Sequence, residues 1–297
     1  MSVQNPLLNG NDQPLRAISL ICLATLLFAS HDALSKYLAG FYPIVMVVWA
    51  RYVVHTLMML AIFVPQTGLS TIIRTKRPGL QLARALCLIA TSLFFTTSLR
   101  YIPLAEATAV NFLAPLLVTA LSVPLLKEVV TRAQWAAVIA GFVGVLIVIR
   151  PGGELFTVAI LLPLTSAFFF GLYQLLTRKL SGIDSPTTSN FLAGIINSLI
   201  MSALVPFFWQ SPSWPHVLFM IGLGTCGMLG HLLLTQAFRH AAPALLAPFS
   251  YLQILFAGMY GYLIFNHTPD IFGVVGISVI CLSGLAVAWG QRRPRLA

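Results

Sequence analysis

Apolar residues occur in long runs in this chain, and short stretches with charge, proline or glycine separate the runs. A helix needs about 20 apolar residues to cross the hydrocarbon core of a bilayer. The pattern therefore predicts an all-α membrane protein with ten transmembrane helices. The predicted spans are Ala17–Tyr37, Pro43–Val64, Leu80–Ser98, Leu104–Leu126, Ala133–Ile149, Leu155–Thr177, Thr187–Trp209, Val217–Ala237, Pro243–Phe265 and Ile271–Gly290.

The two halves of the chain share a layout. A shift of 139 residues aligns Asn111 with Ser250. A shift of 142 residues aligns A-L-S-K-Y-L-A-G at Ala33–Gly40 with L-L-T-R-K-L-S-G at Leu175–Gly182. Each half contains five predicted helices, and because five is odd, the halves enter the membrane in opposite directions. Inverted repeats of this kind are typical of secondary transporters, whose site lies between the repeats.

Basic residues predict the orientation of these repeats. With the N-terminus in the cytoplasm, thirteen loop lysines and arginines face the cytoplasm, and only Lys36, Arg100 and Arg150 face outward. Cytoplasmic loops carry such an excess of positive charge, so both termini are predicted to be cytoplasmic. The predicted organisation is a polar N-terminus (1–16), a first five-helix repeat (17–149), a second five-helix repeat (155–290) and a basic tail (291–297).

Composition supports a membrane protein and narrows its chemistry. Hydrophobic residues make up 58% of the chain and charged residues 8%, which leaves too little polar surface for a soluble globule. The net charge of +10 comes from short clusters between apolar runs, as in membrane loops, so no nucleic-acid partner is predicted. Nucleotide-binding, hydrolase and metalloprotease motifs are absent from the sequence, and the four cysteines are isolated. We therefore predict neither an enzyme nor a metal or other cofactor.

The stretch from Leu99 to Leu117 carries three residues that are costly to place in lipid, the carboxylate Glu106, the amide Asn111 and the helix-breaking Pro115. Proline inside a helix removes the hydrogen bond to the carbonyl four residues earlier, here that of Asn111. Backbone opened at membrane depth persists where protein buries it or where it lines a watery cavity. We therefore expect Asn111 to contact a substrate. Glu106 is either a proton acceptor or a carboxylate that interacts with the helix dipole.

Other polar residues inside the spans complete the predicted site. An ionisable group at membrane depth is a functional hypothesis by default, so His31 and Asp32 are predicted to set charge or couple protons, and Arg51 to bind substrate. The alternative is a structural pair of Asp32 with Lys36 or Arg51. Arg84 is expected to extend to the headgroups. Further predicted substrate-binding residues, for which interhelical hydrogen bonding is the alternative role, are Tyr173, Gln174, Ser250, Tyr251 and Gln253.

Three stretches together resemble a known family. They are L-R-Y-I-P-L-A-E-A-T-A-V-N-F-L-A-P-L-L at Leu99–Leu117, W-A-A-V-I-A-G-F-V-G-V-L-I-V-I-R-P-G at Trp135–Gly152 and A-P-A-L-L-A-P-F-S-Y-L-Q at Ala242–Gln253. They are similar to the EamA-type branch of the drug/metabolite transporter superfamily. The resemblance implies a carrier of small metabolites in the bacterial inner membrane, with a cavity between two halves. The family often has Gly-Glu after its fourth and ninth helices, where this chain has Lys127-Glu128 and Asn266-His267.

Two motifs narrow the resemblance. F-A-S-H-D-A-L-S-K-Y-L at Phe28–Leu38 and V-V-W-A-R-Y-V-V-H at Val47–His55 look like the bacterial group that includes riboflavin and S-adenosylmethionine carriers. The resemblance implies riboflavin uptake, with S-adenosylmethionine uptake or export of amino acids and other metabolites as alternatives. A lipid-handling or scaffolding protein is the alternative from another class. The expected partners are a small-molecule substrate and the lipid bilayer, and a homodimer is left open.

Overall fold

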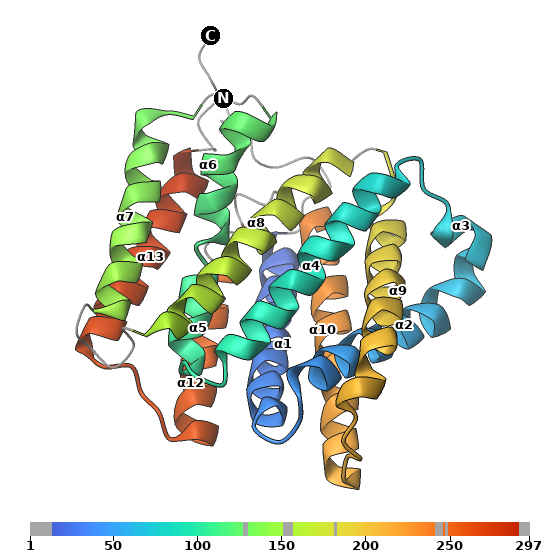
Figure 1. The fold of residues 1–297 in the computed structure, drawn as a ribbon. Coiled ribbons are helices and arrows are strands. Elements are labelled where there is room, and N and C mark those ends of the chain that lie inside the picture. The colour runs from blue at the N-terminus through green and yellow to red at the C-terminus, as the bar shows by residue number, and fades with distance from the viewer. Residues whose placement is uncertain are drawn as a thin grey trace.

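The computed structural model describes residues 14–126, 130–150, 157–180, 183–240, 246 and 249–290. Every regular element within these ranges is helical (Figure 1). The first half contains α1 (Pro14–Ala39), α2 (Ile44–Thr67), α3 (Leu69–Ile73), α4 (Pro78–Ser98), α5 (Leu104–Asn111), α6 (Ala114–Leu126) and α7 (Arg132–Ile149). The second half contains η1 (Val158–Ile160), α8 (Leu161–Leu180), α9 (Pro186–Leu204), η2 (Val205–Phe208), α10 (Trp214–His240), α12 (Leu252–Phe265) and α13 (Ile271–Gly290).

Eight helical segments in the described residues are long and apolar enough to cross a membrane, with α5 and α6 together forming one of them. The helix α12 has 14 residues, and the apolar segment counted in α13, Ile271–Ala286, is also shorter than a full span. The all-α membrane fold is therefore confirmed. The count of ten spans and the cytoplasmic position of both termini stay predictions.

A break near Pro115 divides the fourth predicted span. Helix α5 ends at Asn111 and α6 begins at Ala114. Past the break, the Leu116 amide donates to the Leu113 carbonyl at 2.9 Å, three residues back. The interruption follows from the missing N–H of proline. Pro248 in the second half and the Lys127-Glu128 pair lie outside the described residues.

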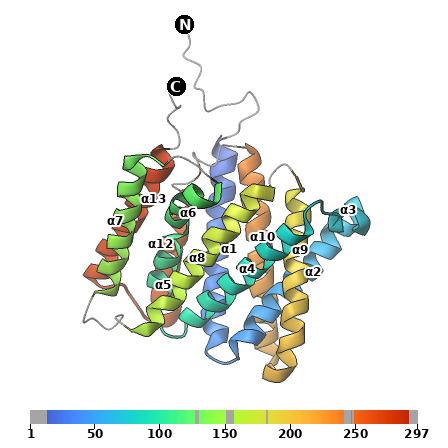
Figure 2. The same cartoon turned by 45° about the horizontal axis from the view of Figure 1, so that its top comes forward.

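The helix pairing follows the two repeats. In chain order, α1, α2 and α4 correspond to α8, α9 and α10. Helix α1 packs along α10, and α4 packs along α8, so the same pairing recurs with the halves exchanged. The remaining equivalent helices, α7 and α13, pack against each other (Figure 2). They approach so closely that a Cβ atom on Gly276 would lie 2.6 Å from the Gly144 carbonyl oxygen. Contacts of this kind between small residues are typical of membrane helices.

The connections between helices define two ends of the bundle. At the bottom of Figure 1 lie the α1–α2 loop and the connections that precede α5 and α10. A pocket of about 800 Å³ opens here, and we call this the pocket end. At the opposite end lie α3 and the α8–α9 connection, which contains Asp184. We call it the Asp184 end.

Candidate functional site

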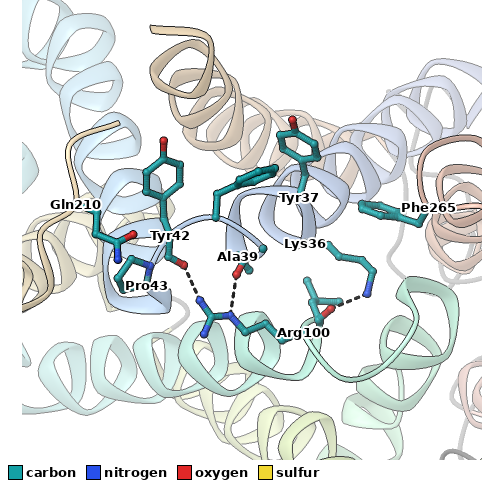
Figure 3. A pocket seen from close by; sticks show the side chains of 11 residues that line it. Lys36, Tyr37, Ala39, Tyr42, Pro43, Arg100, Gln210 and Phe265 are labelled. Carbon is teal, nitrogen blue, oxygen red and sulfur yellow. Dashed lines mark hydrogen bonds between the residues drawn. The ribbon is translucent and has the colours of Figure 1, made fainter. Parts of the chain in front are cut away.

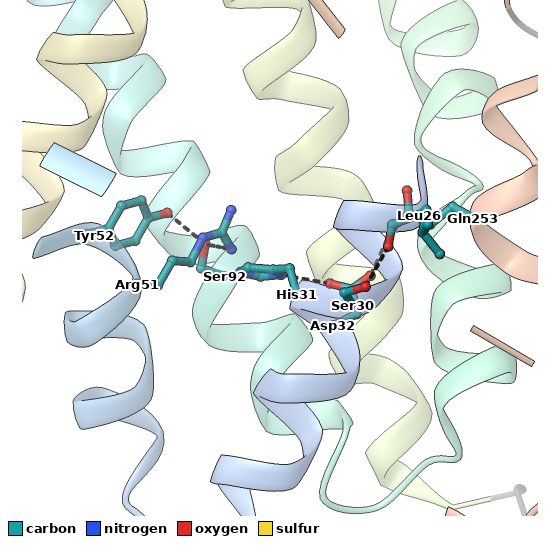
Figure 4. Close-up of polar contacts among 8 residues, drawn as sticks. All are labelled: Leu26, Ser30, His31, Asp32, Arg51, Tyr52, Ser92 and Gln253. Atoms are coloured by element: carbon teal, nitrogen blue, oxygen red, sulfur yellow. Dashed lines mark hydrogen bonds and ion pairs between the residues drawn. The ribbon is translucent and has the colours of Figure 1, made fainter. Parts of the chain in front are cut away.

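Asp32 on α1 lies at a contact between the two halves. Its Oδ2 atom accepts a hydrogen bond from Gln253 Nε2 of α12 at 2.8 Å, and its Oδ1 atom lies 3.1 Å from His31 Nδ1 (Figure 4). Both Asp32 and His31 are buried. Neither predicted structural partner, Lys36 or Arg51, lies within 4 Å of the Asp32 carboxylate in the described structure. Two predicted site residues, Asp32 and Gln253, thus meet although 221 positions separate them.

Arg51 on α2 is a half-buried cation with few partners. Its Nη1 atom donates to Ser92 Oγ at 3.0 Å, and Ser92 Oγ also lies 2.7 Å from the Tyr52 hydroxyl oxygen (Figure 4). The guanidinium has five N–H donors, and this is its one hydrogen bond within the part of the chain that the structure describes. No described carboxylate lies within 4 Å of it. Arg51 therefore keeps donors available for a ligand.

Three histidines lie close to Arg51. His31 on α1, His55 on α2 and His231 on α10 are all near enough to interact electrostatically with its guanidinium. The His55 and His231 rings are 6.3 Å apart. Sequence reasoning placed neither His55 nor His231 in the site. The spacing of four between Arg51 and His55, which puts both on one helical face, was the signal available.

Several buried polar atoms in this region have no hydrogen-bond partner among the described residues. They include His31 Nε2 and both amide atoms of the Asn197 side chain. Asn197 on α9 is fully buried, and the adjacent Ser198 hydroxyl lies 2.9 Å from the Thr56 hydroxyl of α2. Buried polar groups are nearly always hydrogen bonded. Arg51, which has spare donors, and these unmet atoms are thus interior polar groups whose hydrogen bonds the described part of the chain leaves incomplete.

Arg84 on α4 differs from Arg51. Its Nε atom donates to Thr177, Nη1 to the Ser189 carbonyl, and Nη2 to Tyr173 and Asn190, at 2.7 to 3.2 Å. The guanidinium also lies 4.5 Å from the centre of the Tyr173 ring. The expectation that Arg84 reaches the headgroups is wrong, because only 1% of the residue is exposed. It joins α4 to α8 and α9. The hydroxyl of Tyr173, a predicted site residue, is therefore already bonded to Arg84.

Asn111 pairs with the second half. Its Oδ1 atom accepts a hydrogen bond from Ser166 Oγ of α8 at 2.9 Å. Ser166 Oγ also lies 3.2 Å from the Thr91 carbonyl oxygen of α4. The amide thus lies beside the α5–α6 break, as predicted, and serves an interhelical contact in this structure. A role in binding substrate stays a prediction.

The remaining predicted residues on α8 and α12 differ in their surroundings. Tyr251, at the start of α12, is buried against Phe112, with ring centres 5.3 Å apart. Its hydroxyl lies against Gly284 of α13, where an added Cβ would be 1.4 Å away. Ser250 directly precedes Tyr251 and is half-buried. Gln174 is half-buried, and its side chain has no hydrogen-bond partner within the described ranges. The structure does not bring Tyr251 and Gln174 to Arg51 through any direct polar contact.

Glu106 lies in the first turn of α5 and is buried. Its Oε1 atom is 3.0 Å from His267 Nε2, whereas Oε2 is buried without a hydrogen-bond partner among the described residues. His267 follows the end of α12. Glu106 of the first half is therefore paired with a histidine of the second half. Its role in proton coupling stays a prediction.

A link at each end of the bundle joins the two halves. At the pocket end, the Tyr42 hydroxyl lies 2.7 Å from His216 Nδ1, and it accepts a hydrogen bond from the Ser213 amide at 3.2 Å. We call these contacts the Tyr42 link. They join the α1–α2 loop to the start of α10.

At the other end, Asp184 joins the α8–α9 connection to the start of α4. It accepts hydrogen bonds from the Lys76 amide at 3.1 Å, from Gln81 Nε2 at 2.8 Å and from the Thr75 hydroxyl. Burial raises the pKa of Asp184, but these hydrogen bonds together outweigh burial and hold the pKa below its ordinary value. We call these contacts the Asp184 link. The shift of 142 residues that aligns α1 with α8 takes Tyr42 to Asp184, so the links occupy equivalent places in the two repeats.

Comparison with known proteins agrees with this architecture. The model of the EamA-like transporter family matches residues 15–150 and again residues 157–289. A crystal structure with 17% sequence identity aligns with a TM-score of 0.64 over 94% of this chain and 98% of its own, which shows the same fold.

Bacterial relatives extend over nearly the whole chain. An S-adenosylmethionine uptake transporter of Rickettsia conorii is 26% identical over 94% of both chains. A riboflavin transporter of Vibrio cholerae is 27% identical over 95% of this chain and 96% of its own. A pseudopaline exporter of Pseudomonas aeruginosa is 24% identical over 91% of this chain and 95% of its own.

The apolar helices and these relatives identify a multi-pass protein of the bacterial inner membrane. The two matches of the family model cover almost all of the described structure, one for each half. They also account for the pairing of α1 with α10 and of α4 with α8 as the packing of two related units. This chain belongs to the EamA-like transporter family.

Proposed function

We propose that this chain is a secondary transporter that takes up riboflavin, a flat and uncharged heteroaromatic metabolite, by alternating access between its two repeats. The observation that carries this proposal is the interior group formed by Arg51, His31 and Asn197. Arg51 has spare donors, and the other two have buried polar atoms without partners in the described structure. An ionisable group at membrane depth in a transporter family is a functional residue by default.

The charge around the three histidines favours riboflavin over a cation. Among the charged groups that interact with His31, His55 and His231, Arg51 and Arg84 contribute two positive charges and Asp32 one negative charge. With neutral histidines the sum of these charges is +1, and the other buried acid, Glu106, lies against His267. The flavin ring offers carbonyl oxygens that accept hydrogen bonds, and arginine stacks on flat rings as well as donating to them. S-adenosylmethionine carries a sulfonium cation, which this charge opposes.

S-adenosylmethionine is the second candidate. The buried Asp32 carboxylate offers a counter-charge for a sulfonium group, and a relative named as an S-adenosylmethionine uptake transporter matches 94% of this chain. Asp32 is already bonded to Gln253 at 2.8 Å, so a cation would have to displace that contact. This is why we place riboflavin first.

The two links provide a basis for alternating access. Each joins one repeat to the other at one end of the bundle, and both are formed in this structure. A solute enters through one end only when the link there is broken, while the other link keeps the opposite end closed. We propose that an ion gradient supplies the energy, with protonation at His31, Asp32 or Glu106 coupled to the exchange.

The test is uptake by purified protein in liposomes with an imposed proton gradient. Labelled riboflavin should accumulate, and labelled S-adenosylmethionine should accumulate at least tenfold more slowly. Accumulation of S-adenosylmethionine alone would select the second candidate. Movement of solute only out of preloaded vesicles would indicate export, and lipid exchange between leaflets without solute uptake would favour the lipid-handling alternative.

Substitution of Arg51 tests the site. Arg51→Gln should lower riboflavin uptake at least about tenfold, the equivalent of about 1.4 kcal/mol, because it removes the unpaired donors. Arg150→Gln removes the same charge from an exposed pair with Asp270, so it should leave uptake unchanged. Equal uptake by the two variants, at equal amounts of folded protein, would reject the site. Asn111→Ala should also impair uptake, and unchanged uptake would remove Asn111 from the site.

A further inference from the structure

The pocket at the pocket end is separate from the interior group, and the proposed function assigns no ligand to it; Tyr42 is the one lining residue that also belongs to the Tyr42 link. Its lining comes from both repeats and consists of Lys36, Tyr37, Ala39, Gly40, Phe41, Tyr42, Pro43, Leu99, Arg100, Gln210 and Phe265 (Figure 3). We propose that this pocket binds an aromatic anion, a flat ring system that carries a phosphate or carboxylate group.

Two cations in the pocket are held in fixed positions. Lys36 Nζ donates to the Leu99 carbonyl at 2.6 Å and to the Ile102 carbonyl at 3.0 Å. Arg100 Nε donates to the Ala39 carbonyl at 2.7 Å, and its Nη2 donates to the Tyr42 carbonyl at 2.6 Å (Figure 3). These contacts anchor the side chains before a ligand arrives, which lowers the entropic cost of binding.

The backbone carbonyls position these charges without neutralising them. The pocket lining contains no carboxylate, and no described carboxylate lies within 4 Å of Lys36 or Arg100. Glu106 is the acid that interacts with Lys36, and its own hydrogen bond goes to His267. Arg100 Nη1 and the third N–H of Lys36 have no hydrogen-bond partner among the described residues, so both remain available to an anion.

Aromatic rings in the pocket would recognise the flat part of the ligand. The centre of the Phe265 ring lies 5.5 Å from Lys36 Nζ, and the centres of the Tyr37 and Phe41 rings are 5.1 Å apart. Phe41 is 55% exposed although it is large and apolar. A flat ligand ring can stack on such surfaces at about 4.5–7 Å between centres. The volume of about 800 Å³ falls within the range typical of small-molecule sites, about 300–1,000 Å³.

The probe is flavin mononucleotide, a fluorescent flat ring with one phosphate. The full chain is placed in discs of zwitterionic phosphatidylcholine, and binding is followed by fluorescence anisotropy. Flavin mononucleotide should bind at least tenfold more tightly than riboflavin, which lacks the phosphate. It should also bind at least tenfold more tightly than inorganic phosphate, measured by the concentration of inorganic phosphate that displaces it. Equal affinity for the two flavins would overturn the proposal. So would equal affinity for flavin mononucleotide and inorganic phosphate, or competition by phosphatidylglycerol discs, since these indicate a plain phosphate or lipid headgroup site.

A matched pair of variants locates the site. Lys36→Met removes one pocket cation and should weaken flavin mononucleotide binding about tenfold. Arg150→Met removes one cation from the same end of the bundle but outside the pocket, and should leave affinity within twofold. Equal effects of the two variants would overturn the assignment.

A measurement on the wild-type protein keeps the test independent of folding. The affinity for flavin mononucleotide should fall at least fivefold between 50 and 300 mM salt, because salt screens exposed charges. An affinity that stays the same between 50 and 300 mM salt would overturn the proposal, even if Lys36→Met does not fold. The binding site does not rest on riboflavin uptake. Uptake without nucleotide binding would reject this inference alone, and binding without uptake would reject the proposed function alone.

Discussion

Loss of the Tyr42 link should open the pocket end. Tyr42→Phe keeps the ring and removes the hydroxyl that contacts His216 at 2.7 Å and the Ser213 amide at 3.2 Å. Each hydrogen bond contributes about 0.5–1.5 kcal/mol net, so the two together contribute about 1–3 kcal/mol. A coupling of about 1–3 kcal/mol changes the ratio of closed to open forms about 5- to 150-fold.

The assay measures distances at both ends of the bundle. Paired spin labels replace Phe41 and Trp214 at the pocket end, which are 55% and 80% exposed. A second pair replaces the exposed residues Thr67 and Lys179 at the Asp184 end. The four native cysteines are first changed to alanine. Tyr42→Phe should lengthen the distance between the first pair and leave the second unchanged.

Asp184→Asn is the matched variant at the other end. It removes the charge that attracts three donors and should lengthen only the distance at the Asp184 end. Two variants that lengthen the same distance, or neither, would refute the assignment of one link to each end. Lengthening at both ends by either variant would show that the links are not independent closures.

Acidification should weaken the Asp184 link. The pKa of Asp184 is held below its ordinary value in the folded protein. A carboxyl of this kind stabilises the fold above its ordinary pKa of about 3.9, and that contribution is lost as the pH falls through the lower folded pKa. The distance at the Asp184 end should therefore lengthen below about pH 4, and it should not respond to pH in Asp184→Asn. An unchanged wild-type distance at low pH would contradict this.

Two further predictions concern packing inside the bundle. Gly284→Ala should lower the thermal unfolding temperature through an overpacking cost of about 1–3 kcal/mol, because the new methyl group meets the Tyr251 hydroxyl. Gly79→Ala is the control, because its methyl group meets nothing within 4 Å. Equal unfolding temperatures for the two variants would contradict the contact. Arg84→Met should destabilise the fold by at least about 3 kcal/mol, since it leaves several buried partners unpaired at about 1–3 kcal/mol each. Arg150→Met should cost under about 1 kcal/mol because its ion pair is exposed, and similar melting of these variants would refute the anchoring role of Arg84.

Local features of this fold followed from the sequence. Run length and hydropathy predicted membrane helices because a bilayer imposes a nearly fixed apolar length on any segment that crosses it. Pro115 predicted the interruption between α5 and α6 because the missing N–H acts four residues away at most. The repeat was also visible, because helices that pack alike in two halves retain similar spacing. Each of these properties depends on neighbours along the chain.

The polar contacts needed the tertiary structure. The sequence marked Asp32 and Gln253 as buried polar residues, but their hydrogen bond depends on how α1 and α12 are rotated and at what depth they meet. The same is true of Arg84, whose position near a helix end suggested exposure although α8 and α9 enclose it. Side-chain rotation and helix depth are set by packing between distant segments. The sequence therefore determined which segments form apolar helices, and only the fold decided which polar groups are buried and which of them touch.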